Sequence, residues 1–319
     1  MGRTGALRVL LAATLVALLL FPLVGERFYI QYATKIMIMA IFAMSLDLLV
    51  GYTGLVSLGH ALYYGIAGYA LVLLSGLGEM SLWWTLPASM ALAALAALAV
   101  GALVLRTSGI YFIMVTLAFA QMAYFFVRDS AYFGGSDGKY LSSRPGVSLF
   151  GWQPLDLENY LHRYYLTLVL TVGVYLLLRR VLGSLFGRVL VGIRDNEPRM
   201  RSLGFATFSY KLAAFVLAGA LAGLAGYLTA MQDGIMNPEQ LGWNRSGEAL
   251  IMVILGGMGT LAGPAFGAGA LMVLELVFSI WTKYWQLLLG VFVIAVVLFL
   301  PRGLGSLFAR RRGREDDGG

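Results

Sequence analysis

The sequence predicts an all-α integral membrane protein: a polytopic helical bundle of eight to ten transmembrane helices with glycine-broken or re-entrant segments. Of the 319 residues, 60% are hydrophobic and only 12% are charged, whereas soluble domains contain about 25% charged residues. The mean hydropathy is +0.81. Apolar runs long enough to cross a bilayer as helices recur along the chain. Because these runs are continuous and do not alternate, they favour helices over the strands of a membrane barrel.

The apolar runs define the candidate spans. They cover residues 6–24, 29–50, 54–76, 82–105, 109–127, 164–181, 211–231, 248–258, 262–280 and 284–300. The stretch 248–258 is too short to cross a bilayer of about 30 Å alone. We therefore expect either a half-helix there or a helix that continues through the following glycines. The first run resembles a signal peptide, but no small-x-small cleavage site follows it, and we interpret it as a retained span.

Basic residues predict the orientation of the chain. They gather before the first span, between the fourth and fifth spans, in the loop 182–210 and in the tail 306–319. Ten spans place all four regions on one side, which the positive-inside rule makes cytoplasmic. Eight spans would also do so if one hairpin were re-entrant. We predict one transmembrane permease domain, 1–305, with both termini cytoplasmic and an extracytoplasmic loop at 128–163, where the charges balance.

The sequence contains no pattern for catalysis, for a metal or for a cofactor. It has no cysteine, and its two histidines form no HExxH pair, which argues against thiolate and zinc sites. Gly138-Lys139 lacks the earlier glycine and the following Ser or Thr of a phosphate-binding loop. Any ATP that drives transport is therefore expected to be hydrolysed by partner subunits. The net charge of +7 lies between spans, so it predicts orientation and not nucleic-acid binding.

Two glycine-rich segments interrupt the apolar runs. The first reads GYTGLVSLGHALYYGIAGY over residues 51–69, and the second reads LGGMGTLAGPAFGAG over residues 255–269. Broken helices at membrane depth are tolerated where they line a cavity, and transporters use them in this way. Close helix packing is the alternative explanation for so many small residues.

Candidate residues for the translocation pathway lie in and beside these segments. Asp47 and Glu275 fall inside apolar runs, where an ionisable group is costly and is a functional candidate by default. We expect Asp47 to hold the first glycine break together, and His60 is either a packing residue or a ligand. The candidates are Asp47, Ser57, Gly59, His60, Gly256, Gly257, Gly259, Gly263, Pro264 and Glu275.

The longest cytoplasmic loop mixes apolar and charged residues over 186–205. This composition predicts a short amphipathic helix that Gly204 ends with a positive φ. Such a helix inserts its apolar side chains into a groove of a partner, or lies on anionic membrane lipid. We expect the first, with Val189, Leu190 and Ile193 as the buried anchors. The candidate contact residues are Arg188, Val189, Leu190, Ile193, Arg194, Glu197 and Gly204.

These segments resemble the LivM-type permeases of branched-chain amino acid importers. Members of that family read much like GYTGLVSLGHA, GRVLVGIRDNE and LGGMGTLAGPAFGA, and RTSGIYFIMVTLAFA over 106–120 and GGSDG over 134–138 also match. The likeness extends from about residue 30 to 305. It implies the permease subunit of an ATP-binding-cassette importer in the bacterial inner membrane. It also implies three kinds of partner: a second, LivH-type permease, two cytoplasmic ATPases and an extracytoplasmic solute-binding protein. Within this chain, it implies that 188–204 is the coupling loop that touches an ATPase.

Alternatives remain open at the level of the sequence. The family carries an apolar residue where this chain has Lys139, and the stretch 140–152 has no match. Relatives import urea, amides or aromatic acids, so these are alternatives to leucine, isoleucine and valine. A stand-alone secondary transporter or channel would suit the broken spans but leaves the basic amphipathic loop without a task. A membrane-embedded enzyme would need clustered acid, base or metal-binding groups.

Overall fold

The structure is a computed structural model that describes residues 3–76, 81–149 and 152–299. Helices dominate these ranges, and the predicted all-α architecture is confirmed. Six helices, α2, α4, α5, α6, α8 and α10, are long and apolar enough to cross a membrane in the part of the chain described. The predicted tail, 306–319, lies outside the described residues.

The α-helices follow the predicted spans. They are α1 (Arg3–Val24), α2 (Arg27–Thr53), α3 (Ala61–Ser75), α4 (Leu82–Val104), α5 (Ile110–Arg128), α6 (Tyr160–Gly183), α7 (Leu185–Ser202), α8 (Thr207–Asp233), α9 (Trp243–Gly256), α10 (Gly263–Trp281) and α11 (Trp285–Phe299). The short elements are the 3-10 helices η1 (Ala131–Phe133), η2 (Gly135–Asp137) and η3 (Pro238–Leu241), and the strands β1 (Lys139–Tyr140), β2 (Val147–Leu149), β3 (Trp152–Leu155) and β4 (Ile235–Met236).

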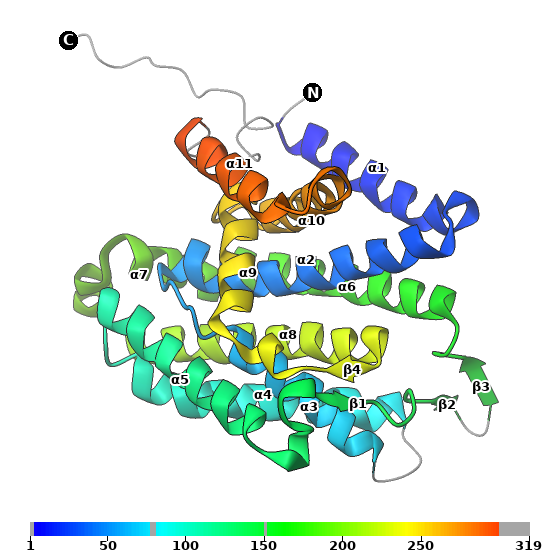
Figure 1. Ribbon diagram of the computed structural model, residues 1–319. Helices are drawn as coiled ribbons and strands as arrows, with labels where there is room; N and C mark the ends of the chain where they lie inside the picture. Colours follow the sequence, from blue (N-terminus) through cyan, green and yellow to red (C-terminus); the bar gives the residue numbers. More distant parts are fainter. Residues whose placement is uncertain (1–2, 77–80, 150–151, 300–319) are drawn as a thin grey trace.

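Helix α8 lies at the centre of the bundle. In Figure 1 it runs between the layer of α2 and α6 and the layer of α3, α4 and α5, and it packs against α2, α3 and α4. Small residues explain the close packing of α8 on α4. Gly219 of α8 faces Ala97 of α4, and Gly223 of α8 faces Ala93 of α4. The two glycines are four residues apart on α8, and the two alanines are four residues apart on α4. Membrane helices lack a hydrophobic driving force against lipid, so such small-residue stripes let dispersion contacts hold them together.

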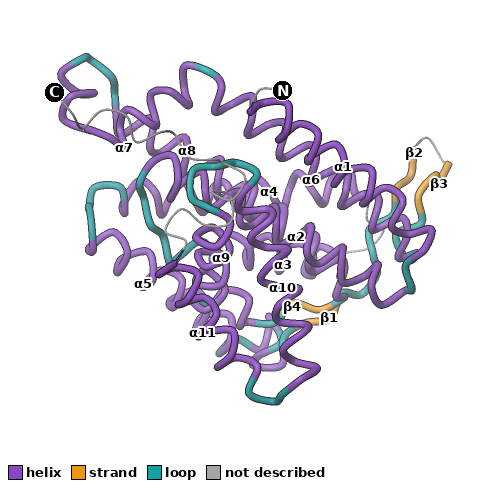
Figure 2. The backbone as a smooth tube through the Cα atoms, turned by 90° about the horizontal axis from the view of Figure 1, so that it is seen from above, coloured by secondary structure: helices purple, strands orange, loops and turns teal. Residues whose placement is uncertain are grey.

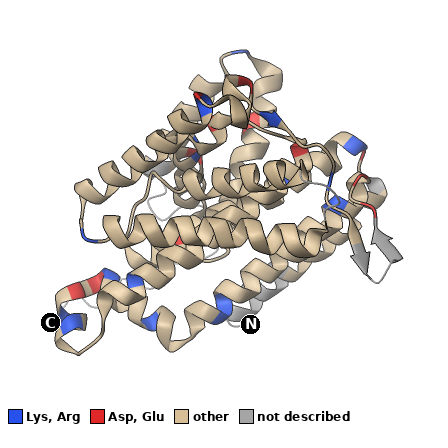
Figure 3. Cartoon of the chain, turned by 90° about the horizontal axis from the view of Figure 1, so that it is seen from below, with Lys and Arg blue, Asp and Glu red and all other residues tan. Residues whose placement is uncertain are grey.

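The two ends of the bundle are distinct. Figures 1 and 2 place α7 at one end and the paired strands at the opposite end. Strands β1 and β4 pair antiparallel, with Lys139 opposite Met236, and β2 and β3 form a second antiparallel pair. Most of the helical surface between the ends is free of Lys, Arg, Asp and Glu (Figure 3). The loop 182–210 and the loop 128–163 therefore lie at opposite ends, as the charge pattern predicts.

Two of the predicted spans are half-helices. Helix α3 begins at Ala61, whereas the predicted span began at residue 54. The chain is non-helical from the end of α2 at Thr53 up to Ala61. Helix α9 has 14 residues, which at a rise of about 1.5 Å per residue is about 21 Å, short of the roughly 30 Å bilayer core. It ends at Gly256 and does not continue through the glycines, so the half-helix interpretation is confirmed. In Figure 1, α9 runs across the direction of α2 and α8.

Candidate translocation site

The N-termini of the two half-helices meet inside the bundle. The N–H of Ala61, the first residue of α3, donates to Ser246 Oγ in the first turn of α9 at 2.8 Å, and both residues are fully buried. The segment that leads into α9 runs alongside α3, from the end of the bundle that carries the strands back to this junction. Met236 of β4 packs at Gly68, and Leu241 of η3 packs at Gly65. The junction therefore lies between the two ends of the bundle, where helix-broken backbone must find internal partners.

Side chains satisfy the backbone of the non-helical segment 54–60. The N–H of Leu58 donates to Thr116 Oγ1 of α5 at 3.3 Å, and the N–H of Gly59 donates to Ser57 Oγ at 3.3 Å. A Cβ at Gly59 would overlap the backbone carbonyl of Thr116, so only glycine allows this approach. Ser57 and Gly59, both predicted for the pathway, thus shape the break itself.

His60 packs between α2 and α3. Its side chain is fully buried, its Nε2 lies 2.8 Å from Ser45 Oγ, and its ring stacks on Phe42 with 5.4 Å between ring centroids. The ring also meets Tyr63 edge-on at 6.0 Å. These contacts are those of a packing histidine, which was one of the two interpretations of the sequence.

Asp47 joins α2 to the second glycine segment. Its Oδ1 accepts a hydrogen bond from the N–H of Gly259 at 2.8 Å, and the residue is 1% exposed. Close by, Tyr52 Oη accepts from the N–H of Leu261 at 3.2 Å. The sequence predicted that Asp47 stabilises the first glycine-rich segment, which follows it in the chain. Asp47 instead contacts the second segment, because the turn after α9 folds back onto the end of α2.

The same end of α2 contacts α7. Arg194 Nη1 donates to the carbonyl of Gly51 at 2.5 Å, and a Cβ at Gly51 would overlap the backbone of Gly259. Gly51 thus touches both α7 and the turn 257–262. The structure brings three predicted residues, Asp47, Gly259 and Arg194, into one contiguous junction.

The remaining glycines of the second segment serve close packing. A Cβ at Gly256 would overlap the carbonyl of Gly263, and a Cβ at Gly263 would overlap Thr260 Oγ1. Gly257 ends α9 with a φ of +104°, and Pro264 stands in the first turn of α10, where its missing N–H costs nothing. The tight α9–α10 turn explains these residues without a ligand.

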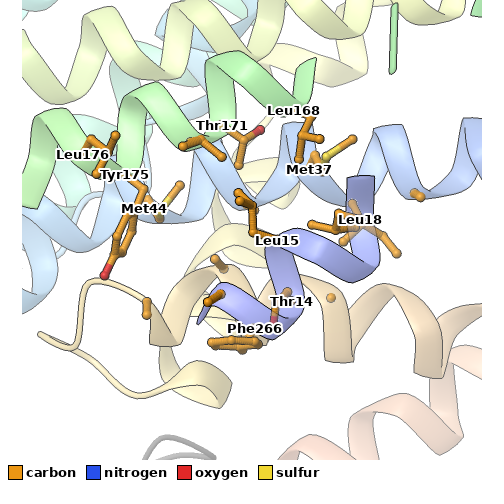
Figure 4. A pocket seen from close by; sticks show the side chains of 18 of the residues that line it. Thr14, Leu15, Leu18, Met37, Met44, Leu168, Thr171, Tyr175, Leu176 and Phe266 are labelled. Carbon is orange, nitrogen blue, oxygen red and sulfur yellow. The ribbon is translucent and has the colours of Figure 1, made fainter. Parts of the chain in front are cut away.

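An apolar cavity of about 570 Å³ lies beside the second glycine segment (Figure 4). It is open on one side and bordered by α1, α2, α6 and α10, and its lining residues include Leu15, Met37, Leu168 and Phe266, together with Ala262 and Ala265 of that segment. None of the predicted pathway residues lines it. Arg179 is the one charged residue among the described residues that line it, so a zwitterion there would find among them no anionic partner for its ammonium group, which is costly in an apolar cavity.

The sequence analysis missed a charged cluster at the start of α9. The helix begins at Trp243, five residues before the predicted span, and it thereby includes Arg245. Arg245 Nη1 pairs with Glu248 Oε2 at 2.7 Å, and the guanidinium lies over the ring of Tyr64 at 5.6 Å from its centroid. Glu275 of α10 interacts electrostatically with both Arg245 and Glu248. An i, i+3 Arg–Glu pair directly before an apolar run was the available sequence signal.

Helix α7 corrects one expectation. Val189, Leu190 and Ile193 are 2%, 0% and 4% exposed, because this face of α7 packs on α2, α6 and α8 of the same chain. They are therefore not anchors for a partner's groove. Arg188, Arg194 and, just beyond the helix, Leu203 are exposed, the last at 66%, and Arg194 also reaches the carbonyl of Gly51 in α2.

The tip of α7 is a second short helix with its own caps. Asn196 leaves the helical conformation, with φ −159° and ψ 91°, and its Oδ1 accepts from the N–H of Arg199 at 2.9 Å, as an N-cap does. Gly204 follows the last turn with a φ of +86°, and the N–H of Phe205 donates to the carbonyl of Met200 at 3.1 Å. This is a Schellman motif, and the predicted positive φ at Gly204 is confirmed.

Glu197 ties the tip to the start of α8. Its Oε1 lies 2.8 Å from Lys211 Nζ and 2.8 Å from Arg201 Nη2, and it accepts from Thr207 Oγ1 at 3.0 Å. Burial alone would raise the pKa of the Glu197 carboxyl, but these hydrogen bonds outweigh it, and the pKa is lowered below its usual range. Glu197, which the sequence analysis gave as a candidate contact for a partner, thus holds the tip in place within its own chain.

We expect Glu197→Gln to loosen the tip at neutral pH. A folded-state pKa that is lowered means that the carboxylate stabilises the tip fully above its unfolded pKa of about 4.3 and loses this as pH falls through the lower value. Hydrogen exchange of the amides 197–207 should be faster in the variant at pH 7. Acidification should speed exchange in the wild type and leave the variant unchanged relative to intrinsic rates. If the amides 197–207 exchange equally slowly in the wild type and in Glu197→Gln at pH 7, the Glu197 contacts do not stabilise the tip.

A many-helix bundle with half-helices that meet inside it, and with a helix lying across one end, defines a transport permease of the membrane. The chain belongs to the family described as branched-chain amino acid transport system / permease component, whose model matches residues 28–298. It is thus a multi-pass inner-membrane permease of the ATP-binding-cassette importer class, and such importers work with ATPase and binding-protein partners.

Three relatives illustrate this membership. The chain is 30% identical over 326 residues to the high-affinity branched-chain amino acid transport system permease protein LivM of Escherichia coli (strain K12). The match covers 95% of this chain and 76% of the relative, and LivM of Salmonella typhimurium (strain LT2) gives the same values. The autoinducer 2 import system permease protein LsrC of Klebsiella pneumoniae is 31% identical over 175 residues, which cover 52% of this chain and 46% of LsrC. No solved structure matches the chain.

Proposed function

We propose that the chain carries leucine, isoleucine and valine across the inner membrane as one of two permease subunits. Its partners are a second, LivH-type permease, two cytoplasmic ATPases and an extracytoplasmic solute-binding protein. The observation that carries the proposal is the similarity to LivM along 95% of the chain. Urea, amides and aromatic acids are the alternative substrates of the same permease class.

In this proposal the bundle spans 1–305, the tail 306–319 and both termini are cytoplasmic, and the chain itself holds no cofactor. ATP binds to the partner ATPases, and their closure moves α7. The structure supplies a physical route for that movement. Arg194 of α7 holds the carbonyl of Gly51, and Asp47, one turn earlier on α2, holds Gly259. Displacement of α7 therefore pulls on both glycine-rich segments together.

Substrate class is tested by uptake in cells that express the full importer. Radiolabelled L-leucine should enter in an ATP-dependent manner, and excess isoleucine or valine should compete with it, whereas urea, acetamide or L-phenylalanine should not. Competition by one of the last three alone would assign the importer to the corresponding alternative. Uptake that persists after ATP depletion would contradict the ATP-driven class.

The coupling role of α7 is tested at its exposed tip. Leu203 is 66% exposed, so Leu203→Asp should leave folding nearly intact while removing an apolar contact with the ATPase. Gly204 has open space around it but a φ of +86°, so Gly204→Asp adds local strain that displaces the end of the tip helix. Truncating an interface anchor commonly costs about 2 kcal/mol or more. We expect leucine uptake and transport-coupled ATP hydrolysis to fall together, with normal abundance of the chain in the membrane.

Two controls sharpen this test. Ile193→Asp should reduce abundance instead, because Ile193 is buried in its own chain. Arg199→Gln probes the alternative that α7 binds anionic lipid, since Arg199 is exposed and such residues contribute most of the attraction to a charged surface. Wild-type uptake in the Leu203→Asp, Gly204→Asp variant would rule out the coupling contact at this tip.

A further inference from the structure

The charged cluster at the start of α9 lies at membrane depth and is partly exposed. Arg245 and Glu248 side chains are 25% and 48% exposed on the isolated chain. Their helix begins at the junction with α3, between the two ends of the bundle. Ionisable residues within a membrane face the bundle interior or a water-filled cavity, because lipid cannot solvate them. The surface around this pair therefore borders a polar space and not the hydrocarbon of the bilayer.

Arg245 has donors to spare. One end of its guanidinium pairs with Glu248 at 2.7 Å, and Nη2 makes only a long contact of 3.5 Å with Tyr64 Oη. Its Nε is buried and has no hydrogen-bond partner among the described residues. A guanidinium carries five N–H donors in a planar fork that matches a carboxylate. The buried Nε faces the chain itself, so a free carboxylate placed beside Arg245 would accept from Nη2, whose contact with Tyr64 Oη is long.

The helix dipoles add to this preference. Helices α3 and α9 bring their N-termini together, and neither cap residue, His60 or Gly242, provides a side-chain hydrogen bond. The first three N–H groups of α3 already donate, to Ser246 Oγ and to the carbonyls of Gly59 and His60. The helix N-termini therefore contribute their partial positive charge. Half-helix N-termini that converge within a membrane are suited to the anionic group of a substrate.

Acidic groups complete the cluster. Glu248 is about half exposed, and Glu275 of α10 interacts with it and with Arg245. Two carboxylates beside one guanidinium leave one negative charge without a cationic partner within the cluster. A small cationic group, such as a primary ammonium, would neutralise it.

We propose that this cluster binds the zwitterionic backbone of an α-amino acid during translocation. The substrate carboxylate binds Arg245 and the converging helix N-termini, and its ammonium binds between Glu248 and Glu275. Because Arg245 and Glu248 are partly exposed on this chain, the proposal places the cluster against the second permease, with the substrate passing between the two subunits. This inference rests on the proposed function, in that the transported solute is an amino acid.

The absence of cysteine from the chain allows a direct test. Asn244, next to Arg245 and exposed, is replaced by cysteine in the assembled importer, and the rate of its modification by a small charged thiol reagent is measured on this chain. Millimolar L-leucine should slow the modification several-fold. The matched analogues 4-methylpentanoate, which lacks the ammonium, and isopentylamine, which lacks the carboxylate, should not. A cysteine at the exposed Ser279 of α10 is the control and should react at the same rate with and without leucine.

Substitutions in the cluster should remove the effect. With Arg245→Gln, leucine should no longer protect the cysteine, and uptake should fall about tenfold or more, as expected when a charged hydrogen bond is lost. Arg245→Lys should restore part of both. Each of four results would overturn the site. Leucine does not protect the cysteine, or either analogue protects it equally. Protection persists in Arg245→Gln, or the cysteine does not react at all because the partner permease covers it.

Failure of the site and failure of the proposed function are distinguishable. If Arg245→Gln with Glu248→Gln transports leucine like the wild type, only the site is wrong. If the wild-type importer does not take up leucine in an ATP-dependent manner, the proposed function is wrong. If the double substitution abolishes assembly of the two permeases, the pair is an interface contact and the site is overturned.

Discussion

Replacing Gly226 by leucine is expected to prevent the bundle from folding. Gly226 is buried in α8, and a Cβ there would overlap the backbone carbonyl of Tyr64 in α3. Inserting atoms into a packed core costs about 1 to 3 kcal/mol where side chains can move. Here the obstacle is backbone at the most extensive contact of the bundle, that of α3 with α8, so the helices must separate.

Abundance in the membrane and the Tm of the purified importer measure this effect. The matched control is Gly173→Leu in α6, because nothing lies within 4 Å of a Cβ built at Gly173. The control should have wild-type abundance and Tm, whereas Gly226→Leu should accumulate little folded protein. Equal Tm values for the two variants would show that α3 and α8 do not approach each other as closely as the structure has them.

Replacing Asp47 by alanine is expected to uncouple the importer while leaving it assembled. The substitution removes the acceptor of the Gly259 N–H, a hydrogen bond of 2.8 Å between α2 and the turn 257–262. Leaving an N–H that was bonded inside the protein without its acceptor costs about 1 to 3 kcal/mol, which corresponds to roughly tenfold or more in the population of the joined state. Leucine uptake should fall by about this factor, and ATP hydrolysis should persist without transport.

Asp47→Asn is the matched control for this prediction. Its side-chain oxygen can accept the same hydrogen bond from Gly259, so it should retain most of the uptake that alanine loses. Uptake and ATP hydrolysis are measured in proteoliposomes with saturating binding protein. If alanine and asparagine reduce uptake equally, the charge of Asp47 matters and its bond to Gly259 does not. If neither reduces uptake, the junction has no role in coupling.

Much of the fold follows from local sequence properties. The positions of the helices, the break before α3, the shortness of α9 and the amphipathic character of α7 all depend on runs of hydropathy, glycine density and periodicity within about 20 residues. The positive φ of Gly204 is local as well, since it needs only a helix that stops at Ser202 and a residue without a Cβ. The amphipathic helix and the φ of Gly204 were therefore predicted correctly, whereas the break before α3 and the half-helix α9 were each one of two alternatives that the sequence left open.

The sequence could not show what an apolar face packs against. Val189, Leu190 and Ile193 share one face of α7 and must be buried, but periodicity is the same whether the covering surface belongs to the chain or to a partner. Only the packing of α7 on α2, α6 and α8 decides this. Similarly, Arg245 was overlooked because the apolar run after it predicted a later start for α9.

By itself, the sequence determined that the chain is a helical membrane protein, roughly where its apolar segments lie, which loops share an end, and which two glycine-rich segments are candidates for helix breaks. It did so because lipid imposes length and hydropathy on each span separately. Tertiary structure alone decided which residues meet. Ala61 and Ser246 are 185 positions apart and Asp47 and Gly259 are 212 apart. No local pattern encodes such pairs, because they arise only when half-helices leave backbone N–H groups that distant side chains must satisfy within the membrane.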